Sequence, residues 1–181
     1  MAETTESAAT RFERAVLPHL DAAYTLARYL TRDASDAEDA VQETVLRAMR
    51  YLHTLRSDSD ARAWLLAIVR RECYGIRGSM QSRMETVAYD DAPSLQLTDP
   101  SESPEHGAQR QMVRERVRAA IDALSDHLRE TLILREVQQC SYEEISVITD
   151  VPIGTVMSRL ARARARLADL LRGVVDAGDL S

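Results

Sequence analysis

The sequence contains no lysine, so all 23 of its basic residues are arginines, against 29 Asp and Glu. A GC-rich coding bias produces this pattern, so we do not treat it as a binding signal. Aromatic residues are also scarce, at 4% of the chain, whereas Leu, Ala, Arg and Glu dominate. Helices favour straight-chain side chains over aromatic ones. The composition therefore predicts an all-α chain, and its 181 residues predict one or two domains.

Long apolar runs and targeting signals are absent as well. No stretch approaches the ~20 consecutive apolar residues of a membrane span. The first ten residues also lack a charged segment followed by the apolar core of a signal peptide. We therefore expect a cytoplasmic protein with no direct membrane insertion.

The groupings of residues that carry chemistry in enzymes are missing too. Cys73 and Cys140 are isolated in the sequence, which favours small buried apolar residues. There is no glycine-rich phosphate loop, and the histidines lack the spacing of a metal site. These histidines are His19, His53, His106 and His127. We expect no catalytic site, no metal, no cofactor and no small-molecule substrate, and hence a protein that is not an enzyme.

Positive charge gathers near the C-terminal end of this acidic chain. Residues 151–168 contain four arginines and no acid, although the formal net charge of the chain is −6. Just before them, Ser141 and Glu144 have the spacing of a capping box, which begins a helix. Pro152 suits the first turn of a following helix, because its missing N–H costs nothing there. Residues 139–168 are therefore predicted to form a helix-turn-helix.

The second helix of this motif has two distinct sides at about 100° per residue. Its buried side is predicted to collect Ile153, Val156, Leu160, Ala163 and Leu167. The opposite side collects Thr155, Ser158, Arg159, Arg162 and Arg166. Arginines on such a face fit the major groove of DNA, where they reach guanine edges or phosphates. A solvated face on an ordinary surface helix has the same pattern, so both interpretations stand on these residues alone.

Helical periodicity disappears between residues 81 and 107, where three prolines stand among Ser, Thr, Asp and Glu. This composition predicts an acidic flexible linker. The chain is therefore expected to form two small helical domains, residues 8–80 and 108–174. The second is expected to be a four-helix domain that contains the helix-turn-helix.

The first domain is predicted to contain three helical segments. Residues 12–30 carry an apolar stripe that Pro18 interrupts, which predicts a kink or two shorter helices. A helix is expected to begin at Ser35, with Glu38 completing a capping box. Another is expected over residues 60–77, with Gly78 as its C-terminal stop. The core stripe of the helix from Ser35 is predicted to be Val41, Val45, Ala48, Met49 and Leu52.

Two sequence blocks carry a family resemblance. DAEDAVQET at 36–44 is similar to region 2 of bacterial sigma factors, and SYEEI followed by PIGTVMSRLARAR at 141–164 is similar to region 4. Their order, and the short acidic linker between them, resemble the compact extracytoplasmic-function class. The resemblance covers nearly the whole chain. It implies a promoter-specificity subunit that binds core RNA polymerase and promoter DNA and is regulated by an anti-sigma factor.

The resemblance also implies roles for individual residues. The core-polymerase contacts would be Asp36, Asp39, Gln42, Glu43 and Arg47. The minus-10 contacts would be Arg56, Arg62, Arg70, Arg71 and Arg77. The minus-35 contacts would be Thr155, Ser158, Arg159, Arg162 and Arg166. Among these, Ser158 and Arg162 match positions that touch bases. Thr155 and Arg159 match positions that hold the DNA backbone.

The chain departs from the family pattern at three positions that bear on promoter recognition. Arg71 stands where family members often carry asparagine, and Met157 and Ala161 replace larger or basic residues. The resemblance therefore does not give the promoter sequence.

Two other functions are compatible with parts of the pattern. One is a stand-alone helix-turn-helix transcriptional regulator, whose first domain would dimerise or sense a signal. The other is a sigma-like decoy that binds only a regulatory protein. A repressor has no need of the acidic face at residues 36–47, and a decoy has no need of the arginine face at 155–166. Both observations favour the sigma factor.

Overall fold

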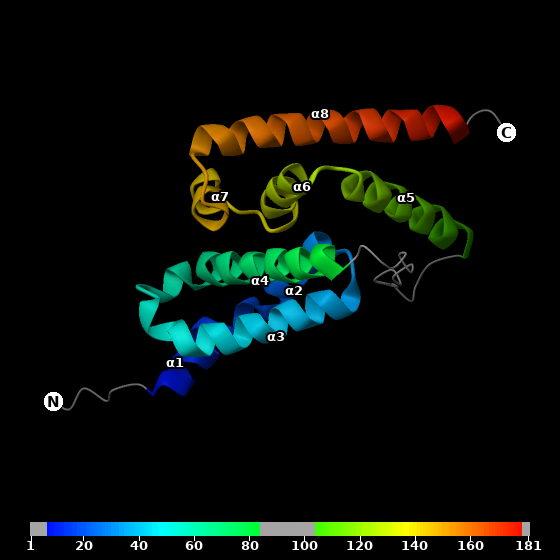
Figure 1. The fold of residues 1–181 in the computed structure, drawn as a ribbon. Helices are drawn as coiled ribbons and strands as arrows, with labels where there is room; N and C mark the ends of the chain where they lie inside the picture. The colour runs from blue at the N-terminus through cyan, green and yellow to red at the C-terminus, as the bar shows by residue number, and fades with distance from the viewer. Residues whose placement is uncertain (1–6, 84–103, 179–181) are drawn as a thin grey trace.

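The structure, a computed structural model, describes residues 7–83 and 104–178, and its regular elements there are all helical. This confirms the predicted all-α fold class. The helices form two groups, residues 8–83 and 104–178, which lie one above the other (Figure 1). Most of the expected linker, at 84–103, lies outside the described residues.

The first group contains α1 (Ala8–Ala15), η1 (Leu17–His19), α2 (Leu20–Thr31), α3 (Ala34–Tyr51), η2 (Leu52–Thr54), η3 (Asp58–Asp60) and α4 (Ala61–Arg83). Pro18 lies in the short 3-10 turn η1 between α1 and α2, which confirms two shorter helices. The N-cap of α3 is Asp33, so the predicted capping box of Ser35 and Glu38 was wrong. The Asp33 carboxylate accepts a hydrogen bond from the backbone N–H of Asp36, at 2.9 Å, so α3 begins one residue before the expected Ser35.

Gly78 does not end α4, contrary to the sequence-based prediction, because the helix continues to Arg83. A glycine stop requires a left-handed backbone conformation, and no glycine among the described residues has a positive φ. Gly78 therefore sits inside the helix, where glycine costs about 1 kcal/mol relative to alanine without breaking it.

The buried side of α3 consists mainly of small side chains. They are Ala37, Ala40, Thr44 and Ala48. Val41 and Val45 are only half-buried and Met49 is 60% exposed, so the predicted stripe was wrong at Met49. Small side chains allow α3 to lie close to α2 and α4, where Leu26, Leu65 and other leucines fill the core. The valines and the methionine are more apolar than these small residues, so hydrophobicity alone indicated the wrong side.

The second group contains α5 (Pro104–Asp122), α6 (Asp126–Leu132), the π-helical turn η4 (Ile133–Val137), α7 (Tyr142–Thr149) and α8 (Ile153–Gly178). Helix α5 begins inside the segment expected to be linker, with Pro104 as its first residue, a position that suits proline. The predicted capping box of Ser141 and Glu144 is present. Glu144 accepts from the Ser141 backbone N–H at 2.6 Å, and the Ser141 hydroxyl accepts from the Glu144 N–H at 3.1 Å.

Helices α7 and α8 form the predicted helix-turn-helix. Asp150 ends α7 in a left-handed conformation, at φ 56°, and α8 starts three residues later. Val156, Leu160 and Ala163 are buried as predicted, and Leu167 is half-buried. Ile153 is 40% exposed, so the prediction was wrong there: the first turn of α8 extends beyond the core.

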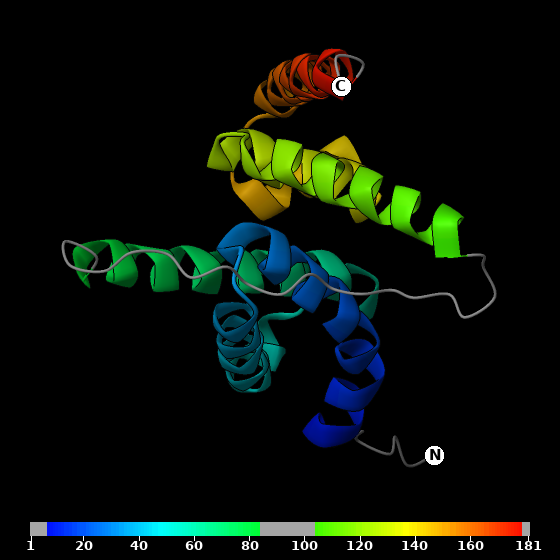
Figure 2. The same ribbon diagram turned by 90° about the vertical axis from the view of Figure 1, so that its right-hand side faces the viewer.

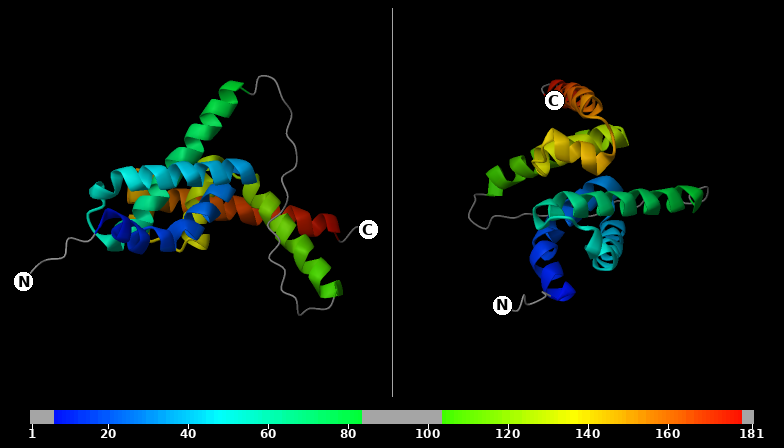
Figure 3. Two further views of the ribbon diagram at one scale, coloured as in Figure 1. Left: turned by 90° about the horizontal axis from the view of Figure 1, so that it is seen from below. Right: turned by 90° about the vertical axis from the view of Figure 1, so that its left-hand side faces the viewer.

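The two groups pack directly against each other. Helix α4 contacts α7, and α2 contacts both α6 and η4, as the stacked helices of Figure 2 illustrate. At this interface the Gln138 side chain donates a hydrogen bond to the Ala22 carbonyl at 3.2 Å. The C-terminal end of α4 and the N-terminal end of α5 project on opposite sides of the molecule (Figure 3). The contact between groups therefore rests on the middle of α4, on α2 and on the turns around α6 and α7.

The stability of α7 depends on the Ser141 hydroxyl of the capping box. We expect Ser141→Ala to lower the free energy of unfolding by about 1 kcal/mol, because the Glu144 N–H loses its acceptor. Urea unfolding measures the change. Ser125→Ala is the matched control, since Ser125 occupies the N-cap of α6 without accepting a hydrogen bond there. Equal losses in the two variants would contradict the assigned cap.

Candidate polymerase and nucleic-acid interfaces

The five residues expected to contact polymerase all lie on α3. Asp39, Gln42 and Glu43 are exposed, Asp36 is half-buried, and Arg47 forms an ion pair with Glu72 of α4 at 2.8 Å. Partial burial and the neighbouring charges of Asp33 and Asp39 raise the pKa of the Asp36 carboxyl. The structure thus provides an exposed acidic surface on one rigid helix.

Apolar side chains extend this acidic surface further along the same helix. Leu46 is 55% exposed and Met49 is 60% exposed, one to two turns beyond Gln42 and Glu43. Sequence reasoning did not assign Leu46 and placed Met49 in the core. The signal that it missed was the run of small residues on the other side of α3, which occupies the buried positions. An exposed surface with acidic and apolar parts is suited to a protein partner.

The arginines expected at the minus-10 element are not gathered on one free surface. Arg56, in the segment between η2 and η3, and Arg71, on α4, are exposed. The other three are Arg62, Arg70 and Arg77, and each of them contacts the second helix group. The structure therefore divides the predicted set into two exposed arginines and three that are bonded to the second helix group.

Arg62 binds the turn that precedes α7. Its Nη2 donates to the Gln138 side-chain oxygen at 2.9 Å and also to the Gln138 carbonyl. Its Nη1 lies 3.5 Å from the Cys140 sulfur. Burial raises the pKa of the Cys140 thiol, and the fully buried side chain agrees with the sequence-based interpretation of this cysteine.

Arg70 forms the most buried ion pair between the helix groups. Its Nε donates to the carboxylate of Glu130 on α6, whose side chain is 0% exposed. Burial raises the pKa of the Glu130 carboxyl, and the hydrogen bond and charge of Arg70 oppose this effect. Glu130 was not singled out from the sequence. The available signal was its position directly before the apolar run TLIL, which favours burial. An acid at a buried position requires a partner.

Arg77 makes the third contact. It forms an ion pair with Asp126 at 2.9 Å and donates to the Leu30 carbonyl at 3.3 Å. Burial alone would raise the pKa of the Asp126 carboxyl. The hydrogen bond from Arg77 and the charges of Arg77 and Arg129 outweigh this effect and hold the pKa below its ordinary value. In this arrangement three arginines of α4 hold the two helix groups together.

The segment that carries Arg56 is itself tied to α1. Arg11 donates to the Leu55 carbonyl at 2.8 Å and to the Asp58 carboxylate at 3.2 Å. Arg14 donates to the same carboxylate at 2.6 Å, and its hydrogen bond is the main cause of the lowered pKa of Asp58. These contacts restrain the segment on both sides of Arg56 and leave its side chain exposed.

The polar side of α8 is open at most of the positions expected to contact the minus-35 element. Ser158, Arg162 and Arg166 are exposed, and Thr155 is half-buried. Arg159 is also half-buried. Its Nη1 is buried and has no hydrogen-bond partner within the described residues, while its charge acts on Glu130. The structure thus turns Arg159 partly inward. Ser158 and Arg162 are exposed, and each donates one hydrogen bond to a backbone carbonyl within α8, at 3.0 Å and 3.3 Å.

Within the described residues, no helix combines the length and apolarity of a membrane span. In the same part of the chain, no three His, Cys, Asp or Glu side chains lie together as metal ligands.

Comparison with known proteins identifies the family. Residues 15–76 match the family model of sigma-70 region 2, and residues 114–167 match that of sigma-70 region 4. The RNA polymerase sigma-H factor of Pseudomonas aeruginosa is 34% identical over 146 residues, which cover 77% of this chain and 75% of that protein. The ECF RNA polymerase sigma factor EcfG of Rhodopseudomonas palustris is 34% identical over 142 residues, covering 78% and 75%.

A solved structure agrees with these matches. The sigma factor RpoE of Bartonella quintana, in complex with the anti-sigma factor NepR, superimposes with a TM-score of 0.72 at 29% identity. The match covers 89% of this chain and 96% of that one. The chain therefore belongs to the sigma-70 family of RNA polymerase sigma factors.

The ion pair of Arg70 generates a prediction about stability. We expect Arg70→Met to lower the free energy of unfolding by about 3 kcal/mol, because it leaves the Glu130 carboxylate buried and unpaired. Adding Glu130→Gln should restore most of the loss, since a neutral amide costs less to bury. Urea unfolding of the single and double variants measures both effects, and the exposed neighbour Arg71→Met is the control. Equal instability of the single and double variants would contradict the pairing.

Proposed function

We propose that this chain is an alternative sigma factor of the extracytoplasmic-function class, which works in the cytoplasm. It binds core RNA polymerase, recognises minus-35 and minus-10 elements and initiates transcription. The observation that carries this proposal is the separation of two exposed surfaces. One is acidic and apolar, on α3, and the other is polar and arginine-rich, on α8. A protein that connects polymerase to DNA needs both.

The polymerase surface comprises the exposed residues of α3. Asp39, Gln42 and Glu43 form its polar part, with Asp36 at the start of the helix and Arg47 beside Glu72. Leu46 and Met49 add apolar area, which is exposed here and becomes buried against the partner. Charges of this kind steer association, and the apolar side chains supply the affinity.

The promoter surface is divided between the two helix groups. Ser158 and Arg162 contact bases of the minus-35 element from α8, while Thr155 and Arg159 contact its backbone, and Arg166 adds a further contact to the same element. Arg56 and Arg71 are available to the minus-10 strand in the arrangement described above. Arg62, Arg70 and Arg77 reach that strand only after the helix groups separate, because their side chains are bonded to the second group.

This arrangement also suits control by a protein partner. The similar sigma factor of Bartonella quintana was solved with an anti-sigma factor bound. We propose that an anti-sigma factor likewise regulates this chain, and that the closed arrangement of its two helix groups is one state on which such a regulator acts.

Reconstituted transcription tests the proposal. With core RNA polymerase on genomic promoter fragments, we expect specific initiation by the wild-type chain. We expect core binding about tenfold weaker or worse for Asp39→Ala with Glu43→Ala, a loss of about 1.4 kcal/mol or more. The control, Glu13→Ala with Glu143→Ala, removes two exposed acids elsewhere. A chain that binds duplex DNA alone but never initiates would instead be a stand-alone regulator.

Substitutions of Arg162 and Arg159 on the α8 surface should affect DNA binding in different ways. We expect Arg162→Ala to reduce discrimination at one base pair of the minus-35 element by about 1–3 kcal/mol. Arg159→Ala should weaken all sequences alike and lower the salt dependence of binding by about one unit of slope. Selection of bound sequences from a random library by the holoenzyme, followed by salt titration, measures both. A uniform loss for Arg162→Ala would refute its assignment to a base.

A further inference from the structure

The segment between α3 and α4 carries Arg56, one of the two proposed minus-10 arginines that the closed arrangement leaves exposed. Two local contacts hold this segment. Leu55 is 3% exposed and packs in the core, and the Ser57 hydroxyl accepts a hydrogen bond from the Ser59 N–H at 3.4 Å. Because Ser57 and Ser59 are themselves exposed, these contacts fix the surroundings of Arg56 only in part.

Helix α1 supplies a further restraint. Arg11 donates from Nη2 to the Leu55 carbonyl at 2.8 Å and from Nε to the Asp58 carboxylate at 3.2 Å, so one side chain spans the segment across Arg56. Arg14 donates to the other oxygen of Asp58 at 2.6 Å. We call Arg11, Arg14 and Asp58 the α1 clamp. The bonded residues are 44 to 47 positions apart in the sequence, so only the fold brings them together.

Helix α1 itself is peripheral. Among the described elements it packs extensively only against η1, the turn that follows it. Its buried side chains are Phe12 and Ala15, whereas Arg11 and Arg14 remain partly open to solvent. In Figure 1, α1 lies at the end of the first group, apart from the helices of the second. The clamp therefore links a peripheral helix to the segment that carries Arg56.

The acid of the clamp lies close to a proposed DNA contact. Asp58 is two residues from Arg56, and an unpaired carboxylate there would repel the phosphates of a DNA strand. The hydrogen bond from Arg14 is the main cause of the lowered pKa of the Asp58 carboxyl, which therefore stays ionised and bonded. With two arginines to one acid, the clamp as a whole is cationic. The carboxylate thus contributes geometry rather than negative charge to this surface.

We propose that Arg11 and Asp58 are positioning residues for the minus-10 strand, which hold the segment so that Arg56 reaches the phosphates of that strand. This inference rests on the function proposed above and adds α1 to it. A segment that is already fixed in its binding conformation loses less conformational freedom when a ligand binds, so its affinity is higher. Arg11 and Asp58 themselves do not contact the strand.

Binding of a single strand tests the proposal. The complex of core RNA polymerase with the full-length chain is titrated with a fluorescent oligonucleotide, the minus-10 non-template strand of a promoter from which the wild-type chain initiates. We expect Asp58→Asn to weaken binding about fivefold, because the segment must then be ordered during binding. Loss of a negative charge alone would strengthen binding, since it reduces repulsion of the phosphates. The direction of the change therefore distinguishes positioning from charge.

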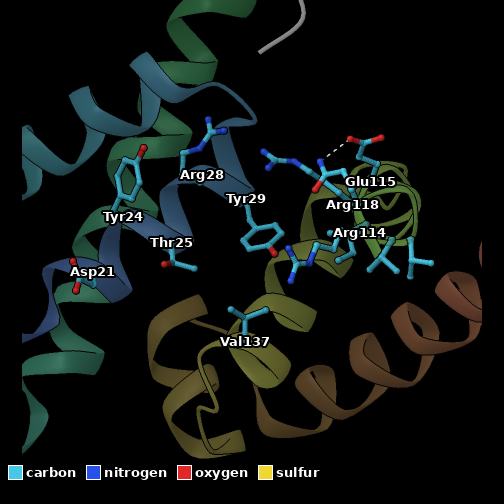
Figure 4. Close-up of a pocket in the computed structure, with 13 residues that line it drawn as sticks. Asp21, Tyr24, Thr25, Arg28, Tyr29, Arg114, Glu115, Arg118 and Val137 are labelled. Carbon is cyan, nitrogen blue, oxygen red and sulfur yellow. Dashed lines mark hydrogen bonds between the residues drawn. The ribbon is translucent and has the colours of Figure 1, made fainter. Parts of the chain in front are cut away.

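Two matched controls remove the same charge elsewhere. Asp60→Asn changes an exposed acid of the same segment, whose carboxylate accepts from the Ser59 hydroxyl at 3.3 Å rather than from an arginine. Asp21→Asn changes an exposed acid of α2, beside the groove that Tyr29 and Arg118 also border (Figure 4). Both variants should bind the strand at least as tightly as the wild type. Equal weakening by Asp60→Asn would overturn the positioning role.

A lysine at position 11 separates positioning from direct contact. Arg11→Lys keeps the positive charge and leaves Asp58 in place, but a single ammonium lacks the fork that bridges Leu55 and Asp58. We expect this variant to weaken strand binding about threefold. Unchanged binding in Arg11→Lys, together with a loss in Asp58→Asn, would mean that Asp58 contacts the strand itself and would contradict the proposal.

The dependence on Arg56 distinguishes positioning from a general effect on the fold. In the Arg56→Ala background, Asp58→Asn should cause no further loss of strand affinity, because the side chain that the clamp positions is gone. All variants are compared well below their Tm, so that each is fully folded. Equal losses in the presence and absence of Arg56 would show that the clamp acts in another way.

Hydrogen exchange on the free chain separates this inference from the proposed function. Asp58→Asn and Arg11→Lys should raise amide exchange in residues 55–60 at least about threefold, while α7 keeps its wild-type protection. Unchanged exchange would refute the clamp whether or not the chain initiates transcription. A wild-type chain that never initiates would overturn the proposed function, and the assignment of the clamp to DNA with it. Initiation by the wild type with unchanged strand affinity in Asp58→Asn would overturn this inference alone.

Discussion

The buried ion pair between Arg70 and Glu130 is the contact on which the arrangement of the two helix groups depends. Glu130 is fully buried, so its charge must be compensated from within the protein. Within the described residues its second oxygen has no hydrogen-bond partner, which makes the single contact from Arg70 more important. Arg62 and Arg77 lie toward either end of the same helix and also bond to the second group, Arg62 to the neutral Gln138 and Arg77 to Asp126. One helix of the first group, α4, therefore supplies three polar contacts to the second group, beside the hydrogen bond from Gln138 to the Ala22 carbonyl of α2.

These contacts give α4 two competing roles. We propose that three of its arginines contact the minus-10 strand, yet in the closed arrangement they bond to Gln138, Glu130 and Asp126. The proposed contact with DNA and the observed contact with the second group therefore exclude each other at these side chains. The interaction with the more favourable free energy determines the arrangement. In the proposed function, the free energy of binding polymerase and promoter together must therefore exceed that of the contact between the helix groups.

Much of the local structure was predictable because it depends on neighbouring residues. The capping box of Ser141 and Glu144, the interruption at Pro18 and the helix after Pro152 all formed as expected. Predictions failed where packing outweighed local preference. Met49 is exposed because small residues occupy the buried side of α3, and Gly78 remains helical because the chain does not turn there. Hydrophobicity ranks side chains, but it does not show how closely two helices approach.

The sequence by itself determined the all-α fold, the helix-turn-helix and the exposure of Ser158, Arg162 and Arg166, since helical periodicity places each residue on a side of its helix. The tertiary structure alone decided which arginines of α4 are free. Periodicity does not specify the neighbour that a side of a helix meets, and the partners of Arg62 and Arg70 lie 76 and 60 residues away in the chain.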